Sequence, residues 1–155
     1  FIAGGHRELT VLWDYEEPQV AAIDGWTTPM RCRIDYLTDV AIIDLKSTRS
    51  ANPDDFAKQM WNQGCFVQAA MQQDGVSAIT RKIRPYYWLA VEKEPPYACA
   101  LYEPDREDLQ RARDTYRDWL RKLHVCEERK EWPGYTSGGP MVIQAPRWAR
   151  PREEF

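Results

Sequence analysis

The sequence has no long hydrophobic segment and no closely paired cysteines, and both absences exclude classes of protein. No apolar run approaches the roughly 20 residues needed to span a bilayer, and the start does not read as a signal peptide. The four cysteines, Cys32, Cys65, Cys99 and Cys126, form no Cys-x-x-Cys pair, which argues against common zinc and iron–sulfur motifs. We therefore expect a cytoplasmic protein with buried, reduced thiols and no membrane partner.

The chain also has no large excess of charge of either sign. Its 155 residues include 21 Lys and Arg against 24 Asp and Glu, so it is not a uniformly basic nucleic-acid binder, although basic side chains can still gather on one face. Length and composition fit one globular domain, residues 1–155. Because the first residue is Phe1 and not Met, we expect the chain to be trimmed from a longer polypeptide.

Hydrophobic periodicity predicts a mixed α/β fold, with elements in the order strands, helix, strands, helix. The expected strands are at 7–15, on either side of 39–40, at 85–92 and at 97–102. The expected helices are at 53–73, ending before Asp74-Gly75, and at 104–126, with a loop at 16–29. Two turn-rich aromatic segments of the tail, 132–135 and 146–149, are expected to wrap back onto the domain.

Two short apolar segments within residues 31–46 each carry an acid, Asp35 and Asp44, and the second ends at Lys46. If the chain turns at Asp39 and Val40, position 35 lies opposite position 44, because the two are symmetric about that turn. Directly opposed residues have Cβ atoms about 4.5–5.5 Å apart, so the two carboxylates can reach one cation. Alternation along a strand places Lys46 on the same face as Asp44.

This arrangement is typical of a metal-dependent nuclease. Phosphodiester hydrolysis needs a cation that lowers the pKa of an attacking water, and Mg²⁺ prefers hard oxygen ligands. Asp35 and Asp44 supply carboxylates, the backbone carbonyl of Leu45 adds an oxygen, and Lys46 orients the water or stabilises the transition state. The pattern Asp-x-Lys alone arises by chance in roughly half of chains of this length, so the neighbouring features carry the interpretation.

Four more polar residues are candidates. Gln68 lies among apolar residues of the first predicted helix, where an unpaired amide is costly, so it either bonds to the sheet or contacts the site. Arg33, Thr48 and Arg49 flank the acids and the lysine and are candidates for binding DNA phosphates.

Several motifs occur together in order: RCRID at 31–35, IIDLKST at 42–48, FVQAA at 66–70 followed by Asp74-Gly75, and EWPG with PRWA in the tail. Over about residues 5–149 the sequence resembles the C-terminal nuclease domain of exonuclease VIII, the RecE-type recombination exonucleases of prophages, in the PD-(D/E)xK superfamily. Position by position, the resemblance makes Asp35 and Asp44 metal-binding acids, Leu45 the carbonyl ligand, Lys46 the catalytic lysine and Gln68 the motif glutamine. It also makes Glu8 a further candidate metal ligand.

The resemblance implies a central mixed β-sheet flanked by helices and a Mg²⁺-dependent exonuclease in which Mn²⁺ can substitute. Such an enzyme digests one strand of linear double-stranded DNA from its 5′ end and leaves a 3′ overhang for a single-strand annealing recombinase. The implied assembly is a homo-oligomeric ring. Two features depart from the family: its metal-binding histidine on an upstream helix has no counterpart here, and Met71 and Gln72 stand where a tyrosine commonly follows the glutamine.

Two alternatives stay open. One is a helicase-linked or CRISPR-associated nuclease of the same superfamily, but those often hold an iron–sulfur cluster and the scattered cysteines argue against it. The other is a catalytically idle DNA-binding module that keeps the fold. The intact set of Asp35, Asp44 and Lys46 favours an enzyme over that module.

Overall fold

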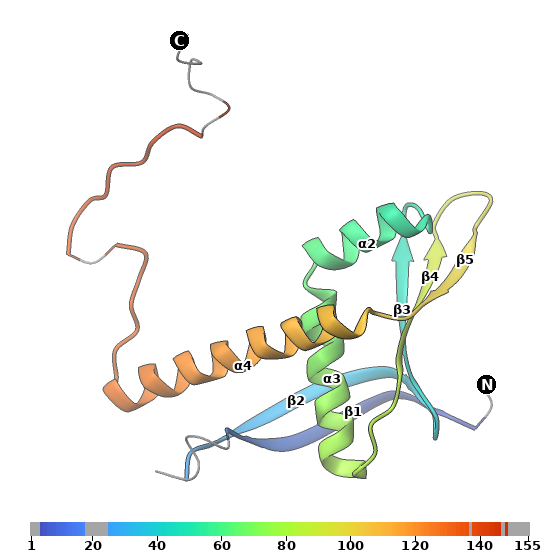
Figure 1. Ribbon diagram of the computed structural model, residues 1–155, viewed down its shortest axis with the longest axis horizontal. Helices are drawn as coiled ribbons and strands as arrows, with labels where there is room; N and C mark the ends of the chain where they lie inside the picture. The colour runs from blue at the N-terminus through green and yellow to red at the C-terminus, as the bar shows by residue number, and fades with distance from the viewer. Residues whose placement is uncertain (1–3, 18–24, 137, 147, 149–155) are drawn as a thin grey trace.

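The computed structural model describes residues 4–17, 25–136, 138–146 and 148. In chain order the elements are β1 (His6–Glu16), β2 (Thr27–Leu37), β3 (Ile42–Thr48), α2 (Pro53–Asn62), α3 (Cys65–Thr80), β4 (Tyr86–Glu92), β5 (Cys99–Tyr102) and α4 (Arg106–Arg129). The strands form one sheet in the order β1-β2-β3-β4-β5 (Figure 1). Strands β3 and β4 run parallel and the other neighbours antiparallel. The predicted mixed α/β fold is confirmed.

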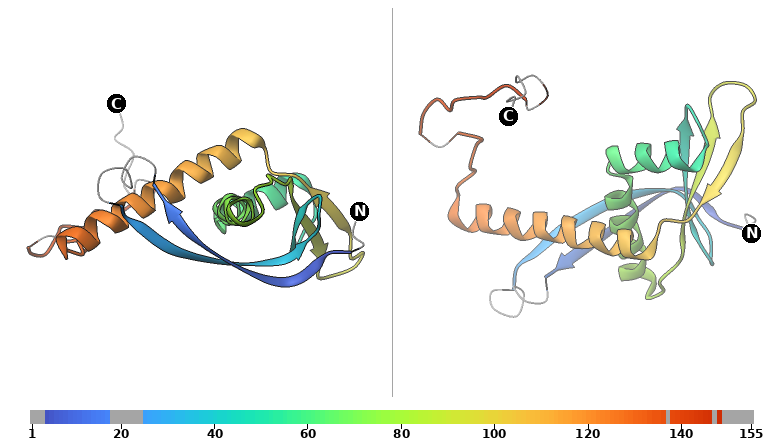
Figure 2. Two further views of the ribbon diagram at one scale, coloured as in Figure 1. Left: turned by 90° about the horizontal axis from the view of Figure 1, so that it is seen from below. Right: turned by 45° about the horizontal axis from the view of Figure 1, so that its top comes forward.

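Helix α3 is the central element of the fold. It packs on β1 and β2 and also on α4, so it lies between the sheet and α4 (Figure 2). Its buried Ala69, Ala70 and Val76 join a core that includes Ile34 of β2 and Tyr86 of β4. Burying a large apolar side chain stabilises a fold by roughly 1.5–3 kcal/mol. This packing fixes the helix against the sheet, and with it the polar side chains that α3 turns toward β3.

The β2–β3 hairpin has the predicted register. Tyr36 pairs with Ile43 and Leu37 with Ile42, and continuing that register sets position 35 opposite position 44. Beyond these pairs β2 leaves β3 and pairs only with β1 within the described residues. The predicted loop at 16–29 extends too far, because β2 already begins at Thr27. Pro29 lies inside β2, at a point where this strand pairs with β1 alone among the described strands, so a missing N–H on the other side of the strand is tolerated. Part of that loop, 18–24, lies outside the described residues.

The predicted helix at 53–73 is two helices. Asn52 caps α2, and its side chain accepts a hydrogen bond from the Asp54 N–H at 3.0 Å. The chain then breaks at Gly64, whose φ of 68° lies in the left-handed region that glycine adopts readily. The break changes the direction of the chain between α2 and α3 (Figure 1).

The predicted stop at Asp74-Gly75 is wrong, because α3 continues to Thr80. Gly75 serves close packing instead: a Cβ there would lie 2.6 Å from the Trp13 ring of β1. Asp74 ties α3 to α4 through ion pairs to Arg113 at 2.8 Å and Arg117 at 3.0 Å. Asp74 and Gly75, which resemble a helix terminus in sequence, therefore connect α3 to α4 and to β1.

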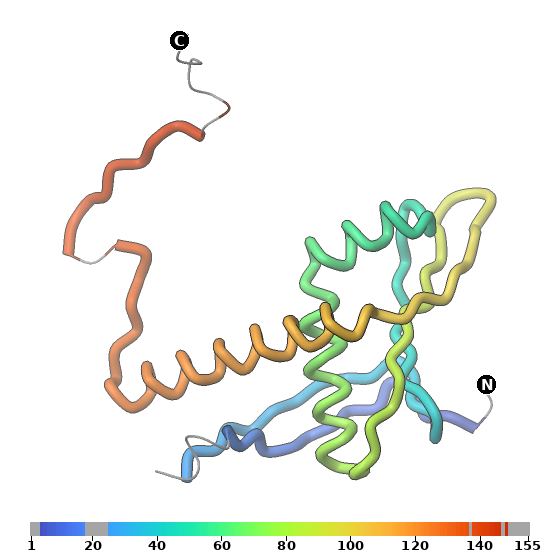
Figure 3. Tube along the Cα trace, viewed as in Figure 1, coloured from blue at the N-terminus to red at the C-terminus, as the bar shows by residue number. Residues whose placement is uncertain are grey.

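The tail does not wrap back as expected. Trp132 is 66% and Trp148 87% exposed, and the chain after α4 runs away from the sheet (Figure 3). The reason lies in α4, whose 24 residues span about 36 Å. Its buried residues Leu109, Ala112 and Tyr116 all lie in the first half, so the tail begins far from the core. Within the segment 146–149, residues 147 and 149 lie outside the described part.

All four thiols are free, as predicted, but only two are buried. Burial raises the pKa of Cys32 to about 11 and also raises the pKa of Cys65. Cys99 is exposed and Cys126 half-buried, so the expectation of burial is wrong for these two. Among the described residues, no helix is long and apolar enough to cross a bilayer.

Candidate active site

Three polar side chains from β3 and α3 form a closed cluster. Lys46 Nζ lies 2.7 Å from Asp44 Oδ2 and donates a hydrogen bond to Gln68 Oε1 at 2.9 Å. Gln68 Nε2 in turn donates to Asp44 Oδ1 at 3.3 Å. Asp44 and Lys46 share one face of β3 because they are two residues apart on a strand, as predicted. Gln68 reaches them because α3 packs against the sheet, so it contacts the site, one of its two predicted roles.

Asp35 joins this cluster from the end of the hairpin. Its Oδ2 accepts a hydrogen bond from the Leu45 N–H at 2.8 Å, so the carboxylate lies between β2 and β3 where the two strands separate. The negative charge of Asp35 and a hydrogen bond between the two side chains both raise the pKa of Asp44. The hairpin therefore brings the two acids together, and the carbonyl of Leu45 lies on the same backbone segment.

Burial dominates the electrostatics of Asp44. Desolvation raises its pKa above the ordinary value, Lys46 opposes this by hydrogen bond and charge, and Asp35 adds to the rise. The residue is only 2% exposed, and its Oδ2 is paired with the Lys46 ammonium at 2.7 Å. Burying a carboxylate costs folding free energy even when it is paired with a lysine, and such a perturbed acid is typical of a functional site.

The donor set fits a hard divalent cation such as Mg²⁺. Such ions take one or two carboxylates and fill the remaining positions with waters and substrate oxygens. Asp35 and Asp44 would provide the carboxylates, and the Leu45 carbonyl would be a further protein oxygen. Among residues that the structure describes, no three of His, Cys, Asp and Glu gather to hold a metal.

The structure does not bring Glu8 to the two acids. Its backbone has a φ of 53°, and its carboxylate forms an ion pair with Arg33 at 2.6 Å, where both side chains are more than half exposed. Thr48 is buried, and its hydroxyl lies 2.7 Å from Gln59 Oε1 and 2.9 Å from the Ser50 carbonyl, so it is engaged in hydrogen bonds within the protein. Of the three predicted phosphate-binding residues, Arg33 and Arg49 are exposed.

Gln72, one of the two residues that depart from the tyrosine expected by resemblance, has a structural role here. Gln72 is buried, its Nε2 donates to the Arg33 carbonyl at 2.7 Å, and its Oε1 accepts from the Tyr86 hydroxyl at 2.6 Å. The side chain thus links α3 to β2 and β4 directly behind the cluster. Its spacing of four residues from Gln68 is the signal that was available in the sequence, since both lie on one helical face.

The sequence matches the family described as "PDDEXK-like domain of unknown function (DUF3799)" over residues 16–145, more than half of the chain. The chain belongs to this family. All four cluster residues of this PDDEXK-like domain, Asp35, Asp44, Lys46 and Gln68, lie inside the matched range. None of the curated proteins matches the chain.

The PDDEXK-like chain is similar to a solved structure from Eubacterium rectale that is named "Putative exonuclease". The two share 18% identity with a TM-score of 0.65 over 94% of this chain and 55% of the other, so this chain spans about half the length of that protein. The similarity shows a shared fold, and together with the PDDEXK-like family match it confirms the predicted PD-(D/E)xK fold. The structure of SSO0001, with 16% identity and a TM-score of 0.43 over 71% of this chain and 48% of that one, is too distant to support a conclusion. The RecE-type assignment stays a prediction.

Proposed function

We propose that this PDDEXK-like domain is a Mg²⁺-dependent DNA exonuclease. The cluster of Asp44, Lys46 and Gln68 beside Asp35 carries the proposal. Burying an ionised carboxylate costs several kcal/mol even when it is paired, and a module that only binds DNA gains nothing from that cost. A buried, perturbed acid next to a lysine is typical of a catalytic centre.

The chemistry divides among the cluster residues. A divalent cation held by Asp35, Asp44 and the Leu45 carbonyl would lower the pKa of a water and neutralise charge on the phosphate. The Lys46 ammonium has three donors, and its contacts to Asp44 and Gln68 fix its position. A remaining proton can then point to the phosphate or the attacking water, where a fixed positive charge stabilises the anionic transition state. Gln68 keeps Lys46 and Asp44 in one arrangement by bonding to both.

The finer part of the proposal follows the sequence resemblance. The substrate is the end of linear double-stranded DNA, digestion proceeds from 5′ to 3′ in the cytoplasm, and the product is a 3′ overhang for a single-strand annealing recombinase. The enzyme acts as a homo-oligomeric ring, with Mn²⁺ able to replace Mg²⁺. The competing function is a catalytically idle DNA-binding module, because the described residues offer no third acid or histidine to a metal.

Cleavage of end-labelled DNA tests this proposal. With Mg²⁺ or Mn²⁺ we expect a linear duplex labelled at its 5′ ends to release short labelled products early, while a 3′ label stays on long strands and a closed circular duplex stays intact. A chelator should stop the reaction, because the bound cation supplies several kcal/mol of the rate enhancement. Salt-sensitive DNA binding without any product would identify the idle module, and undiminished cleavage in the chelator would exclude the metal site.

A further inference from the structure

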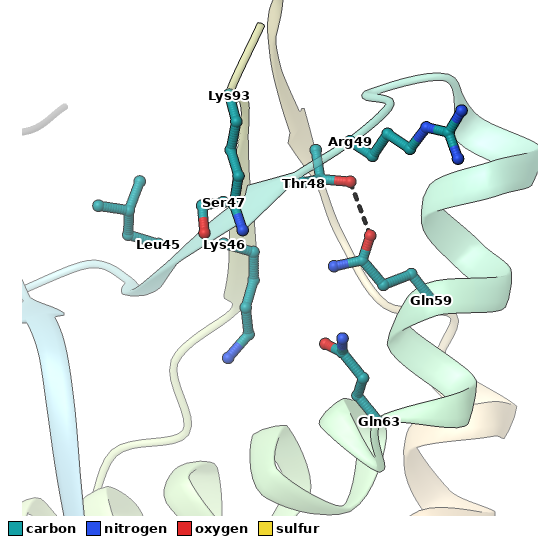
Figure 4. Close-up of a pocket in the computed structure, with 8 residues that line it drawn as sticks. All are labelled: Leu45, Lys46, Ser47, Thr48, Arg49, Gln59, Gln63 and Lys93. Carbon is teal, nitrogen blue, oxygen red and sulfur yellow. Dashed lines mark hydrogen bonds between the residues drawn. The ribbon is translucent and has the colours of Figure 1, made fainter.

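A pocket of about 580 Å³ opens beside the catalytic cluster, at the end of β3. Its walls come from β3, from α2 and from the start of the β4–β5 turn (Figure 4). The lining residues outside β3 are Arg49, Gln59, Gln63 and Lys93. The parallel pairing of β3 with β4 explains the placement of Lys93, whose backbone N–H bonds to the Thr48 carbonyl at 3.0 Å. Lys46 also lines the pocket, so it is continuous with the proposed active site.

The described side chains that line this pocket carry positive charge, which is only partly compensated. Three cations line it, Lys46, Arg49 and Lys93, and none of the described lining residues is acidic. Lys46 is paired with Asp44, whereas Arg49 and Lys93 have no ion pair to another described residue. Figure 4 shows the Lys93 ammonium turned into the pocket and the Arg49 side chain extended along its rim, over α2. Lys93 is therefore the cation placed to meet an anion inside.

Two amides complete the donor set. Gln59 and Gln63 are four residues apart on the same face of the α2 end, and both side chains point into the pocket (Figure 4). The buried Thr48 hydroxyl lies 2.7 Å from Gln59 Oε1 and 2.9 Å from the Ser50 carbonyl. With its oxygen turned to Thr48, the Gln59 amide points its nitrogen into the cavity (Figure 4). A lysine with side-chain amides is a common donor set for phosphate oxygens in DNA complexes.

We infer that Lys93, with Gln59 and Gln63, binds a phosphate of the DNA strand next to the phosphate that is cleaved. This rests on the proposed nuclease function, because the pocket shares Lys46 with that site. Successive phosphates of a strand are separated by about 3.4 Å of helix axis, so a strand whose reactive phosphate lies at Lys46 places a neighbouring one within reach of the pocket. Thr48, which the sequence suggested as a phosphate contact, acts instead by positioning Gln59.

Equilibrium binding separates this contact from catalysis. A fluorescent blunt duplex is titrated with wild type, Lys93→Gln and Lys58→Gln, with Ca²⁺ in place of Mg²⁺ so that affinity is measured without relying on turnover. Lys58 is exposed on α2 and does not line the pocket, so its variant makes the same charge change elsewhere. We expect Lys93→Gln to bind about tenfold more weakly than Lys58→Gln at moderate salt. The slope of log K against log salt should fall by about 1 for Lys93→Gln.

The outcomes of this titration separate the two proposals. Equal affinity and equal salt slope for Lys93→Gln and Lys58→Gln overturn the pocket assignment, whether or not the wild type cleaves DNA. A wild type that binds with the Lys93 effect but never cleaves with Mg²⁺ supports the pocket and overturns the nuclease. A wild type that does not bind DNA overturns both. Duplexes with 5′-phosphate and 5′-hydroxyl ends identify the phosphate: a Lys93 effect confined to the former indicates a terminal phosphate, and an equal effect an internal one.

Discussion

Replacing Lys46 with alanine is expected to lower the rate of Mg²⁺-dependent DNA hydrolysis by roughly 10²–10³-fold, the cost of removing one group that stabilises transition-state charge. The ammonium lies 2.7 Å from Asp44 and 2.9 Å from Gln68, and alanine removes it without removing either acid. A second effect adds to the loss: without this neighbour the pKa of Asp44 rises further, since Lys46 is the group that lowers it. Metal binding by the protonated acid is then weaker.

Lys58→Ala is the matched control for this variant, because Lys58 is an exposed lysine on α2 away from the cluster. Initial rates over a range of Mg²⁺ concentrations, with circular dichroism to verify folding, separate lost catalysis from lost metal affinity. Lys46→Gln keeps a polar side chain between Asp44 and Gln68 and serves as a second variant if the alanine protein folds poorly. A rate for both Lys46 variants equal to that of Lys58→Ala contradicts the assigned role.

Replacing Asp44 with asparagine is expected to abolish hydrolysis and to leave the metal-free protein at least as stable as the wild type. The activity should fall by about 10³-fold or more, because the metal supplies several kcal/mol and each 1.36 kcal/mol is a factor of ten in rate. Asparagine keeps the size of the side chain and an oxygen that can accept from Gln68. It removes the buried charge and one of the two carboxylates of the proposed metal site.

The direction of the stability change follows from the pKa of Asp44. The pKa of Asp44 in the folded protein is raised above its ordinary value of 3.8, chiefly by burial. At a pH between the ordinary pKa and this raised pKa, the folded protein therefore holds the proton more tightly than the unfolded chain does. The contribution of Asp44 to stability therefore falls as pH rises through that window, and the ionised carboxylate destabilises the fold above it. Asparagine carries no such penalty at neutral pH.

Thermal unfolding of wild type, Asp44→Asn and the exposed-turn control Asp39→Asn measures this. Without metal at pH 7 we expect the Asp44→Asn midpoint to equal or exceed that of the wild type. Added Mg²⁺ at ten times its Kd stabilises a binding protein by about 1.4 kcal/mol, which raises the midpoint by roughly 3–6 °C for a chain of this size. We expect this rise for wild type and Asp39→Asn but not for Asp44→Asn. A metal-free Asp44→Asn that is clearly less stable would show that pairing with Lys46 outweighs burial.

Local features of the site were predictable from sequence. The register of the β2–β3 hairpin follows from the symmetry of positions 35 and 44 about the turn, and the shared face of Asp44 and Lys46 follows from strand alternation. The position of Gln68 required only that its helix, α3, pack on the sheet. These inferences succeed because each depends on a few neighbouring residues.

The pocket beside the site depends on non-local pairing, which the sequence does not state. Lys93 reaches the end of β3 because β4 pairs with β3 in parallel, with Thr48 opposite Glu92, whereas periodicity alone leaves the order of strands open. The break at Gly64 sets the direction of α2 and thereby the positions of Gln59 and Gln63. Asp74-Gly75 looked like a helix end because its packing against β1 and α4 has no local signature.

A crystal of the protein soaked in Mn²⁺ tests the central claim most directly, since manganese substitutes for magnesium at oxygen sites and scatters anomalously. We predict an anomalous difference peak between the carboxylates of Asp35 and Asp44, within coordination distance of the Leu45 carbonyl, and its loss in crystals of Asp44→Asn. No peak at these carboxylates in a wild-type crystal at saturating Mn²⁺, or a peak that persists there in Asp44→Asn, would contradict the account.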